Sequence, residues 1–262
     1  MTSISATAPR LAARQVRYEL RSFIRNRRRA MLSFAFPLMF LLIFGSLGRD
    51  QTISSRGDIS FIDFYVPGIL TYAILVTTFN SMAMTVSGLR ARGVLKRIRT
   101  TPLPWSAYVS GLVGATLAAM LAIAALVLLV GIAMLGVDLR LSALPGLVVF
   151  IALGSVCLTA LGIWAARFIP NPESGMPILM IVTLPLMFVS NVFFPIDDAP
   201  TWLKDVAGAF PLKPLADGLA TAFDPRSTGV GLVGHDLLVL ALWTIAGTVL
   251  MLGFLRSLTR SE

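Results

Sequence analysis

Thirty consecutive residues without a charged side chain run from Tyr108 to Val137, with the sequence YVSGLVGATLAAMLAIAALVLLVGIAMLGV. The hydrocarbon core of a membrane is about 30 Å thick, and a helix needs about 20 mainly apolar residues to cross it. This stretch is long enough, and it would place no charge in the lipid, where a charge is costly. It therefore predicts a transmembrane helix.

Five other stretches of the chain are similarly long and apolar. Together they predict an all-α polytopic membrane protein with six transmembrane helices over about 30–47, 64–89, 108–137, 143–166, 176–194 and 237–255. The composition agrees, because 56% hydrophobic and 13% charged residues cannot build a soluble surface. No predicted span has an ionisable side chain between its ends, which disfavours a proton-coupled antiporter.

The basic residues are unevenly divided between the two sides of the predicted bundle. With the N-terminus inside, 16 of the 22 Lys and Arg lie in inner segments, whereas the outer segments contain six bases and ten aspartates. Basic loops stay on the cytoplasmic side. The pattern predicts an even number of crossings, both termini in the cytoplasm and a location in the cytoplasmic (inner) membrane. The Lys and Arg side chains then form a rim at the membrane surface and not a groove that binds nucleic acid.

The first thirty residues form a basic segment with helical periodicity. Arginines recur every three or four residues and alternate with apolar side chains: Arg10, Arg14, Arg17, Arg21, Arg25 and Arg28. This pattern predicts an amphipathic helix over 1–29 that lies in the headgroup layer, with arginine toward anionic lipid. A cleaved signal sequence or an organellar transit peptide is the alternative, but a secretory basic region is much shorter.

Two connections between the spans are predicted to be partly helical. The inner connection, LRARGVLKRIRTTPLPWSAY over 89–108, is basic and predicts a short cytoplasmic helix over 89–101 that ends before Pro102. The outer stretch is too apolar for a solvated loop, and it predicts two short helices within about 199–223, separated by Pro211 and Pro214. These helices would lie on the outer interface or re-enter the membrane between the spans.

The same connections resemble those of a known family. Gly93, the basic run 96–99, the Thr-Pro-Leu at 101–103 and the aromatic Tyr108 resemble the loop after the second span of ABC-2 type transporter permeases. SNVFFPIDDAPTWL over 190–203 and FPLKPLADGL over 210–219 resemble the elements that follow the family's fifth span. The resemblance is closest to the daunorubicin-resistance-like drug and lipid exporters. One departure is the pair Arg90 and Arg92, where the family usually has acidic residues.

The resemblance implies the transmembrane subunit of a type V ABC exporter. Residues 1–29 would be a connecting helix, 30–256 the six-helix domain with a coupling helix at 89–101 and re-entrant outer helices at about 199–223, and 257–262 a cytoplasmic tail. The partners would be an ABC ATPase subunit, a second copy or paralogue of the permease, and membrane lipid. The residues expected to couple to the ATPase are Arg90, Arg92, Gly93, Lys96, Arg97, Arg99, Thr101 and Pro102.

Motifs for catalysis are missing from the sequence. It has no GxxxxGK phosphate loop, so ATP and Mg are expected on the partner ATPase and this chain is expected to bind no cofactor itself. The single cysteine, Cys157, and the single histidine, His235, predict neither a metal site nor a nucleophile. The glycines at 229, 231 and 234 fit a dinucleotide pattern, but no strand precedes them. The chain is therefore expected not to be an enzyme.

The predicted substrate pathway uses polar and aromatic side chains of the second and fifth spans. The candidates are Tyr72, Phe79, Asn80, Phe188, Asn191 and Phe193. An aromatic, uncharged lining suits a hydrophobic or amphipathic substrate such as a drug, an antibiotic or a lipid-like molecule. The small residues of the third and fourth spans, including Gly154 and Gly162, are expected to serve helix packing. An ATP-independent channel or secondary carrier, and a membrane-embedded enzyme or scaffold, remain as alternatives.

Overall fold

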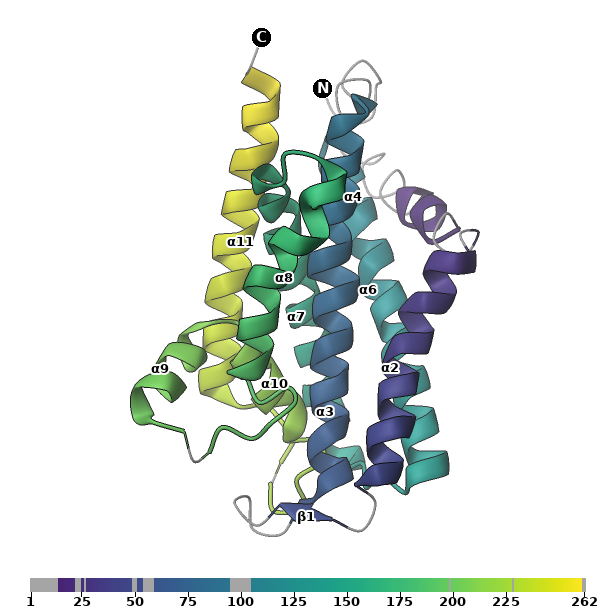
Figure 1. Ribbon diagram of the computed structural model, residues 1–262, viewed down its shortest axis with the longest axis vertical. Coiled ribbons are helices and arrows are strands. Elements are labelled where there is room, and N and C mark those ends of the chain that lie inside the picture. The colour runs from purple at the N-terminus through teal and green to yellow at the C-terminus, as the bar shows by residue number, and fades with distance from the viewer. Residues whose placement is uncertain are drawn as a thin grey trace, which may run out of the picture.

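The computed structural model describes residues 14–21, 25, 27–48, 51–53, 59–94, 105–197, 199–227 and 229–260. Most of these residues are helical, and the longest helices run along the length of the molecule (Figure 1). The first helices are α2 (Arg27–Leu47), α3 (Phe61–Ile74), η2 (Leu75–Asn80), α4 (Ser81–Ala91), α6 (Trp105–Val130) and η3 (Gly131–Leu135). The later ones are η4 (Leu141–Ala143), α7 (Leu144–Ala165), η5 (Ala166–Phe168), α8 (Pro172–Phe188), α9 (Thr201–Ala209), α10 (Leu212–Ala220) and α11 (Gly234–Arg260).

Several of these helices join into continuous apolar rods. Four are long and apolar enough to cross a membrane: Phe61–Ala91, Tyr108–Leu135, Leu141–Phe168 and Gly234–Ser257. Two shorter apolar helices are Ser33–Leu47 and Pro172–Phe188. Each predicted apolar stretch overlaps one of these six helices. The protein is therefore a mostly helical, multi-pass membrane protein, with four helices that meet the length of a span by themselves.

Helix α7 forms the centre of the bundle and packs against α4, α6, α10, α11 and η2. Its glycines allow this close packing. A Cβ atom at Gly162 would lie 2.5 Å from the carbonyl oxygen of Phe79 in η2, and one at Gly154 would lie 2.6 Å from Leu215 in α10. The prediction that these two small residues serve packing is confirmed, since a side chain at position 162 would meet backbone atoms and one at position 154 would require Leu215 to move.

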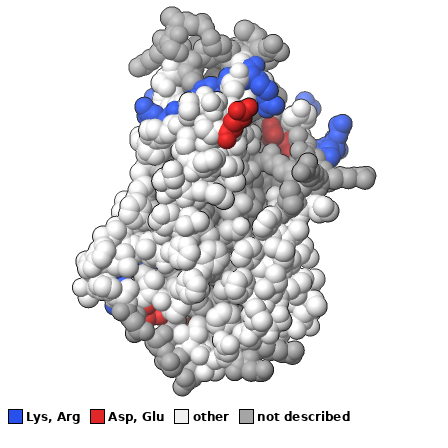
Figure 2. Space-filling view, viewed as in Figure 1, with Lys and Arg blue, Asp and Glu red and all other residues white. Residues whose placement is uncertain are grey.

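Charged side chains lie at the two ends of the rods. Arg90, Arg92, Arg167 and Arg256 lie where α4, α7 and α11 end, and we call this the basic end of the bundle. On the face shown in Figure 2, Lys and Arg gather near this end and the middle of the face is uncharged. An uncharged belt between two charged rims is the distribution that a bilayer requires.

Helix α8 is shorter at its far end than the sequence predicted. The fifth apolar stretch was expected to continue to Phe194, but α8 ends at Phe188, and its last backbone bond runs from the Val189 N–H to the Pro185 carbonyl at 3.2 Å. Three residues later, Asn191 has a left-handed backbone with φ of 56°. A residue in this conformation cannot continue a right-handed helix, so the aromatic residues Phe193 and Phe194 lie in a turn.

The segments at the end opposite the basic end include a feature that the sequence did not predict. The strands β1 (Thr52–Ile53) and β2 (Ile59–Ser60) pair antiparallel between α2 and α3. An all-α fold was expected, and this short hairpin is a small correction to it. Three of its four residues are β-branched, and such residues favour extended backbone.

Two short helices, α9 and α10, are present within 199–223 as predicted. The apolar stripe of α10 is buried, whereas α9 projects from the bundle (Figure 1) and leaves Trp202 and Val206 exposed. Helix α9 is joined to α11 where the Trp243 Nε1–H donates to the Ala209 carbonyl at 2.7 Å. Whether the pair re-enters a membrane depends on the depth of the bilayer and stays a prediction.

Residues 14–21 of the basic N-terminal segment are helical and pack against α6 near the basic end. A Cβ atom at Gly111 would lie 2.2 Å from the Gln15 side chain, and one at Gly114 would lie 2.7 Å from Val16. Arg14, Arg17 and Arg21 remain exposed. Residues 14–21 are thus helical, and the position of this helix in the headgroup layer stays a prediction.

Candidate functional site

The predicted coupling segment begins at the basic end, where α4 stops. The Gly93 N–H donates to the Arg90 carbonyl at 3.0 Å, and Gly93 has φ of 66°. Glycine adopts this left-handed conformation without strain and commonly ends a helix in this way. No atom would lie within 4 Å of a Cβ at this position, so the backbone conformation, and not the available space, requires glycine here.

Arg90 points along the bundle surface to another inner connection. Its guanidinium donates to the carbonyl oxygen of Arg167 at 3.5 Å and to that of Ile169. These carbonyls lie in η5 and directly after it, beyond the end of α7, where backbone oxygens of a helix end have no helical partner. Arg90 therefore joins the end of α4 to the connection between α7 and α8, while the neighbouring Arg92 is exposed.

The remaining predicted coupling residues are Lys96, Arg97, Arg99, Thr101 and Pro102, and all of them lie outside the described residues. The role of the whole segment in ATPase coupling stays a prediction. The structure adds the Arg90 hydrogen bonds, which the sequence could not reveal, because Arg90 and Ile169 are 79 positions apart.

Helix α8 begins directly after this connection. The Asn171 Oδ1 accepts hydrogen bonds from the Ser174 N–H at 3.0 Å and from the Ser174 Oγ at 2.6 Å, and Pro172 follows at the first helical position. This is a well-formed N-terminal cap. α8 then packs against α4. The start of α8 thus follows directly on the connection that Arg90 holds.

At the other end of α8, three predicted pathway residues come together. The rings of Tyr72 and Phe193 lie 5.9 Å apart, and those of Phe188 and Phe193 lie 6.2 Å apart. Phe40 of α2 completes this aromatic cluster, at 5.6 Å from Tyr72 and 6.3 Å from Phe193. We use the term aromatic cluster for these four residues. Ring separations of this size allow favourable aromatic contacts.

Phe40 is a residue that sequence reasoning missed. Its signal was the spacing of Phe36, Phe40 and Phe44, which places three rings on one face of α2. Their centroids are 6.4 Å and 5.7 Å apart in succession. The aromatic face of α2 therefore continues from the cluster in both directions along the helix.

The other three predicted pathway residues lie elsewhere. Phe79 and Asn80 are at the end of the π-helical segment η2, about 12 Å further along the rod than Tyr72 at 1.5 Å per residue. Asn80 is 8% exposed, and its Oδ1 has no hydrogen-bond partner among the described residues. π-helical turns often occur at functional sites. The structure does not bring these two residues into the aromatic cluster.

Asn191 has its amide occupied by neighbouring groups. Its Nδ2 donates to the Asp217 Oδ1 at 2.7 Å, and its Oδ1 accepts from the Ile196 N–H at 2.9 Å. Asp217 also accepts from the Lys213 Nζ at 2.7 Å. These bonds join the turn after α8 to α10, so Asn191 holds the turn in place and does not present an open polar group.

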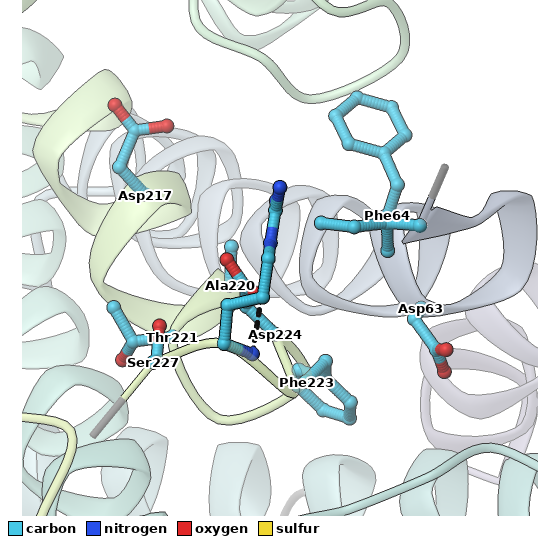
Figure 3. A pocket seen from close by; sticks show the side chains of 10 residues that line it. Asp63, Phe64, Asp217, Ala220, Thr221, Phe223, Asp224 and Ser227 are labelled. Carbon is cyan, nitrogen blue, oxygen red and sulfur yellow. Dashed lines mark hydrogen bonds and ion pairs between the residues drawn. The ribbon is translucent and has the colours of Figure 1, made fainter. Parts of the chain in front are cut away.

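A pocket of about 400 Å³, lined by both apolar and charged side chains, lies next to this network, at the end opposite the basic end. Figure 3 shows Asp217 from α10 and Asp63 from α3 on different sides of it. The Arg226 Nε lies 3.2 Å from the Asp224 Oδ1. Sequence reasoning gave Asp217 no role, and the four-residue spacing of Lys213 and Asp217 was the available signal. Among the described residues, no three His, Cys, Asp or Glu side chains are placed to hold a metal ion.

Replacing Asp217 with alanine is expected to lower the free energy of unfolding by about 1.5–3 kcal/mol, the usual worth of hydrogen bonds to a charged group. The Asn191 amide would lose its acceptor, and the turn after α8 would lose its connection to α10. Chemical denaturation of the detergent-solubilised protein measures the change. Asp205→Ala, on the exposed surface of α9, should change stability by less than about 0.5 kcal/mol. Equal effects of the two substitutions would contradict the prediction.

Comparison with known proteins supports the resemblance found in the sequence. A family model described as ABC-2 type transporter matches residues 14–223. The chain is 31% identical over 188 residues to daunorubicin resistance ABC transporter permease protein DrrB1 of Streptomyces coeruleorubidus, covering 70% of this chain and 62% of that protein. It is 24% identical over 240 residues to a protein of Cyanophora paradoxa described as transport permease ycf38, covering 85% of this chain and 81% of the relative. The chain therefore belongs to the ABC-2 type transporter family.

Proposed function

We propose that the chain is the transmembrane subunit of an ATP-binding-cassette exporter. It would move a hydrophobic or amphipathic substrate, such as a drug, an antibiotic or a lipid-like molecule, out across the cytoplasmic membrane. A separate ATPase subunit would bind ATP and Mg and hydrolyse the ATP, and this chain would have no catalytic site of its own. A second copy of the chain, or a paralogue, would complete the pathway. The family and the drug-resistance relative support this proposal.

The proposed topology has six crossings, with the basic end and both termini in the cytoplasm. The excess of Lys and Arg at that end supports this orientation. The two shorter apolar helices are compatible with crossings, because the 21 residues of α2 extend about 32 Å and the 17 of α8 about 26 Å. Helices α9 and α10 would then lie at the outer surface, beside the turn after α8.

One observation supports the mechanism most strongly: a continuous connection between the coupling segment and the aromatic cluster. Arg90 fixes the end of α4 to the connection that leads into α8, α4 also packs against α8, and α8 ends at Phe188, beside Phe193. Movement of the coupling segment by an ATPase would therefore be transmitted along α8 to the cluster. Such coupling requires that the protein adopt two conformations, and that these differ in the contacts made at the coupling segment and at the aromatic cluster.

The chemistry of the cluster suits the proposed substrates. Phe40, Tyr72, Phe188 and Phe193 offer flat apolar surface and one hydroxyl, with no charge. Sites for drug-sized molecules are mostly apolar and aromatic with few polar groups. Phe188 is 46% exposed, so part of this surface is available for contact with a substrate.

Reconstitution tests the proposal. The chain is co-expressed with a candidate ABC ATPase, purified as a complex and placed in inside-out vesicles with a fluorescent amphipathic drug. We expect uptake that requires ATP, Mg and both subunits, and no ATPase activity from this chain alone. Uptake driven by an ion gradient or by concentration alone would favour a carrier or channel, and turnover without movement of substrate would favour an enzyme.

The same assay tests the cluster. Tyr72→Ala is expected to lower the apparent affinity for the drug by about tenfold, corresponding to about 1–1.5 kcal/mol for a lost aromatic contact, whereas Tyr72→Phe should retain most of it. Tyr18→Ala is the matched control, because Tyr18 is exposed near the basic end. If Tyr72→Ala transports the drug like Tyr18→Ala, the cluster does not contact the substrate.

A further inference from the structure

An apolar groove of about 440 Å³ runs along the bundle near the basic end, away from the aromatic cluster. Helix α7 packs against both α6 and α11 and forms the floor, where Val156 and Ala160 lie one turn apart. Val113 of α6 and Met251 of α11 line the walls. Each helix contributes residues spaced by about one turn, so the groove runs parallel to the helix axes.

The groove is mainly apolar along its length, with the Ser110 and Thr248 hydroxyls as its uncharged polar groups and one cation at its end. The Thr248 hydroxyl already donates to the Thr244 carbonyl at 2.7 Å, so its donor is used within α11. Arg256, one of the lining residues, lies eight positions further along α11, which is about 12 Å at 1.5 Å per residue. An apolar trough with a guanidinium at one end matches an acyl chain joined to an anionic headgroup.

The position of Arg256 along α11 fits the depth of a phospholipid headgroup. It lies 22 residues from Gly234, where the helix begins, or about 33 Å at 1.5 Å per residue. This is close to the thickness of the hydrocarbon core, about 30 Å. If Gly234 lies at one membrane interface, Arg256 lies at the other, with the groove extending from it into the hydrocarbon region.

We propose that this groove binds one anionic phospholipid from the leaflet at the basic end, with an acyl chain between α6 and α11 and the phosphate at Arg256. Apolar space that is left unfilled loses dispersion contacts, and in a bilayer an acyl chain is available to fill it. A second copy of the chain fits less well, because a two-fold contact through this surface would bring Arg256 toward its own counterpart. This inference depends on membrane embedding and not on the transport function.

The test measures lipid binding to the full-length chain in a nonionic detergent. Phosphatidylglycerol and phosphatidylcholine with identical acyl chains are titrated, and the bound lipid per chain is measured by mass spectrometry. We expect saturable binding of phosphatidylglycerol. Arg256→Gln should weaken it about fivefold, the effect of about 1 kcal/mol per basic residue near anionic lipid, while leaving phosphatidylcholine binding unchanged. Val113→Phe should weaken binding of both lipids at least fivefold by obstructing the acyl chain.

Matched control variants separate binding in the groove from the general effects of removing a charge or adding a ring. Lys204→Gln removes a positive charge near the opposite end, and Leu129→Phe adds a ring at an exposed position of α6 outside the groove. Both should bind lipid within twofold of the unsubstituted chain. Equal binding by Arg256→Gln and Lys204→Gln, or by Val113→Phe and Leu129→Phe, would overturn the proposal. If Val113→Phe fails to fold, the comparison between Arg256→Gln and Lys204→Gln decides alone.

Discussion

Replacing Gly68 with valine is expected to have the largest effect on the stability of this protein. A Cβ atom at position 68 would lie 2.1 Å from the carbonyl oxygen of Val192 and 3.1 Å from its carbonyl carbon. Both are backbone atoms, which cannot rotate away as a side chain can. α3 and the turn after α8 would have to separate, and overpacking of this kind costs about 3 kcal/mol or more.

The melting temperature in detergent measures this effect, and it should fall by roughly 6–12 °C for a chain of this size. Gly208→Val is the matched control, because no atom would lie within 4 Å of a Cβ there. It should melt within about 2 °C of the unsubstituted protein. Val192 directly precedes Phe193, so Gly68→Val should also weaken the near-UV circular dichroism of the aromatic cluster. Equal melting temperatures for the two variants would show that the contact is not needed.

The positions of the apolar helices could be predicted from the sequence, because a long uncharged run has few alternatives to a buried helix. The end of α8 could not. The prediction extended it to Phe194, whereas the chain turns after Phe188 because the Asn191 side chain bonds to the Ile196 N–H and to Asp217 of α10. Such a helix end depends on a tertiary contact, which cannot be predicted from the hydropathy of the sequence.

The candidate site could likewise be predicted only in part from the sequence. Tyr72, Phe188 and Phe193 were predicted to line a substrate pathway, and the structure brings these three rings together, whereas their contact with a substrate stays a prediction. Phe40 was missed because its spacing shows only that it shares one face of α2 with other rings, and the packing of α2 against α3 places it beside Tyr72. The direction of the Arg90 side chain could not be predicted either, since its acceptors come from a connection that is distant in sequence.

Replacing Arg90 with alanine is expected to reduce ATP-driven transport by at least about tenfold while the ATPase subunit remains bound. The guanidinium donates to two carbonyls of the connection between α7 and α8, and hydrogen bonds from a charged group are worth about 1.5–3 kcal/mol. Without them, the end of α4 can move without moving the start of α8. A loss of about 1.4 kcal/mol in coupling free energy corresponds to a factor of ten. Uptake into inside-out vesicles and co-purification of the ATPase measure the two properties separately.

Arg167→Ala is the matched control for this experiment. It removes a positive charge from the same surface, yet its backbone carbonyl still accepts the Arg90 hydrogen bond. Transport by Arg167→Ala should remain within about threefold of the unsubstituted chain, the range for an exposed charge worth less than about 0.7 kcal/mol. Arg90→Lys should restore part of the activity, because one ammonium can donate to these carbonyls with less geometric control than a planar guanidinium. If Arg90→Ala instead abolishes binding of the ATPase subunit, Arg90 belongs to the surface that binds the ATPase. If Arg90→Ala transports like Arg167→Ala, the hydrogen bonds between α4 and the α7–α8 connection do not transmit movement from the ATPase.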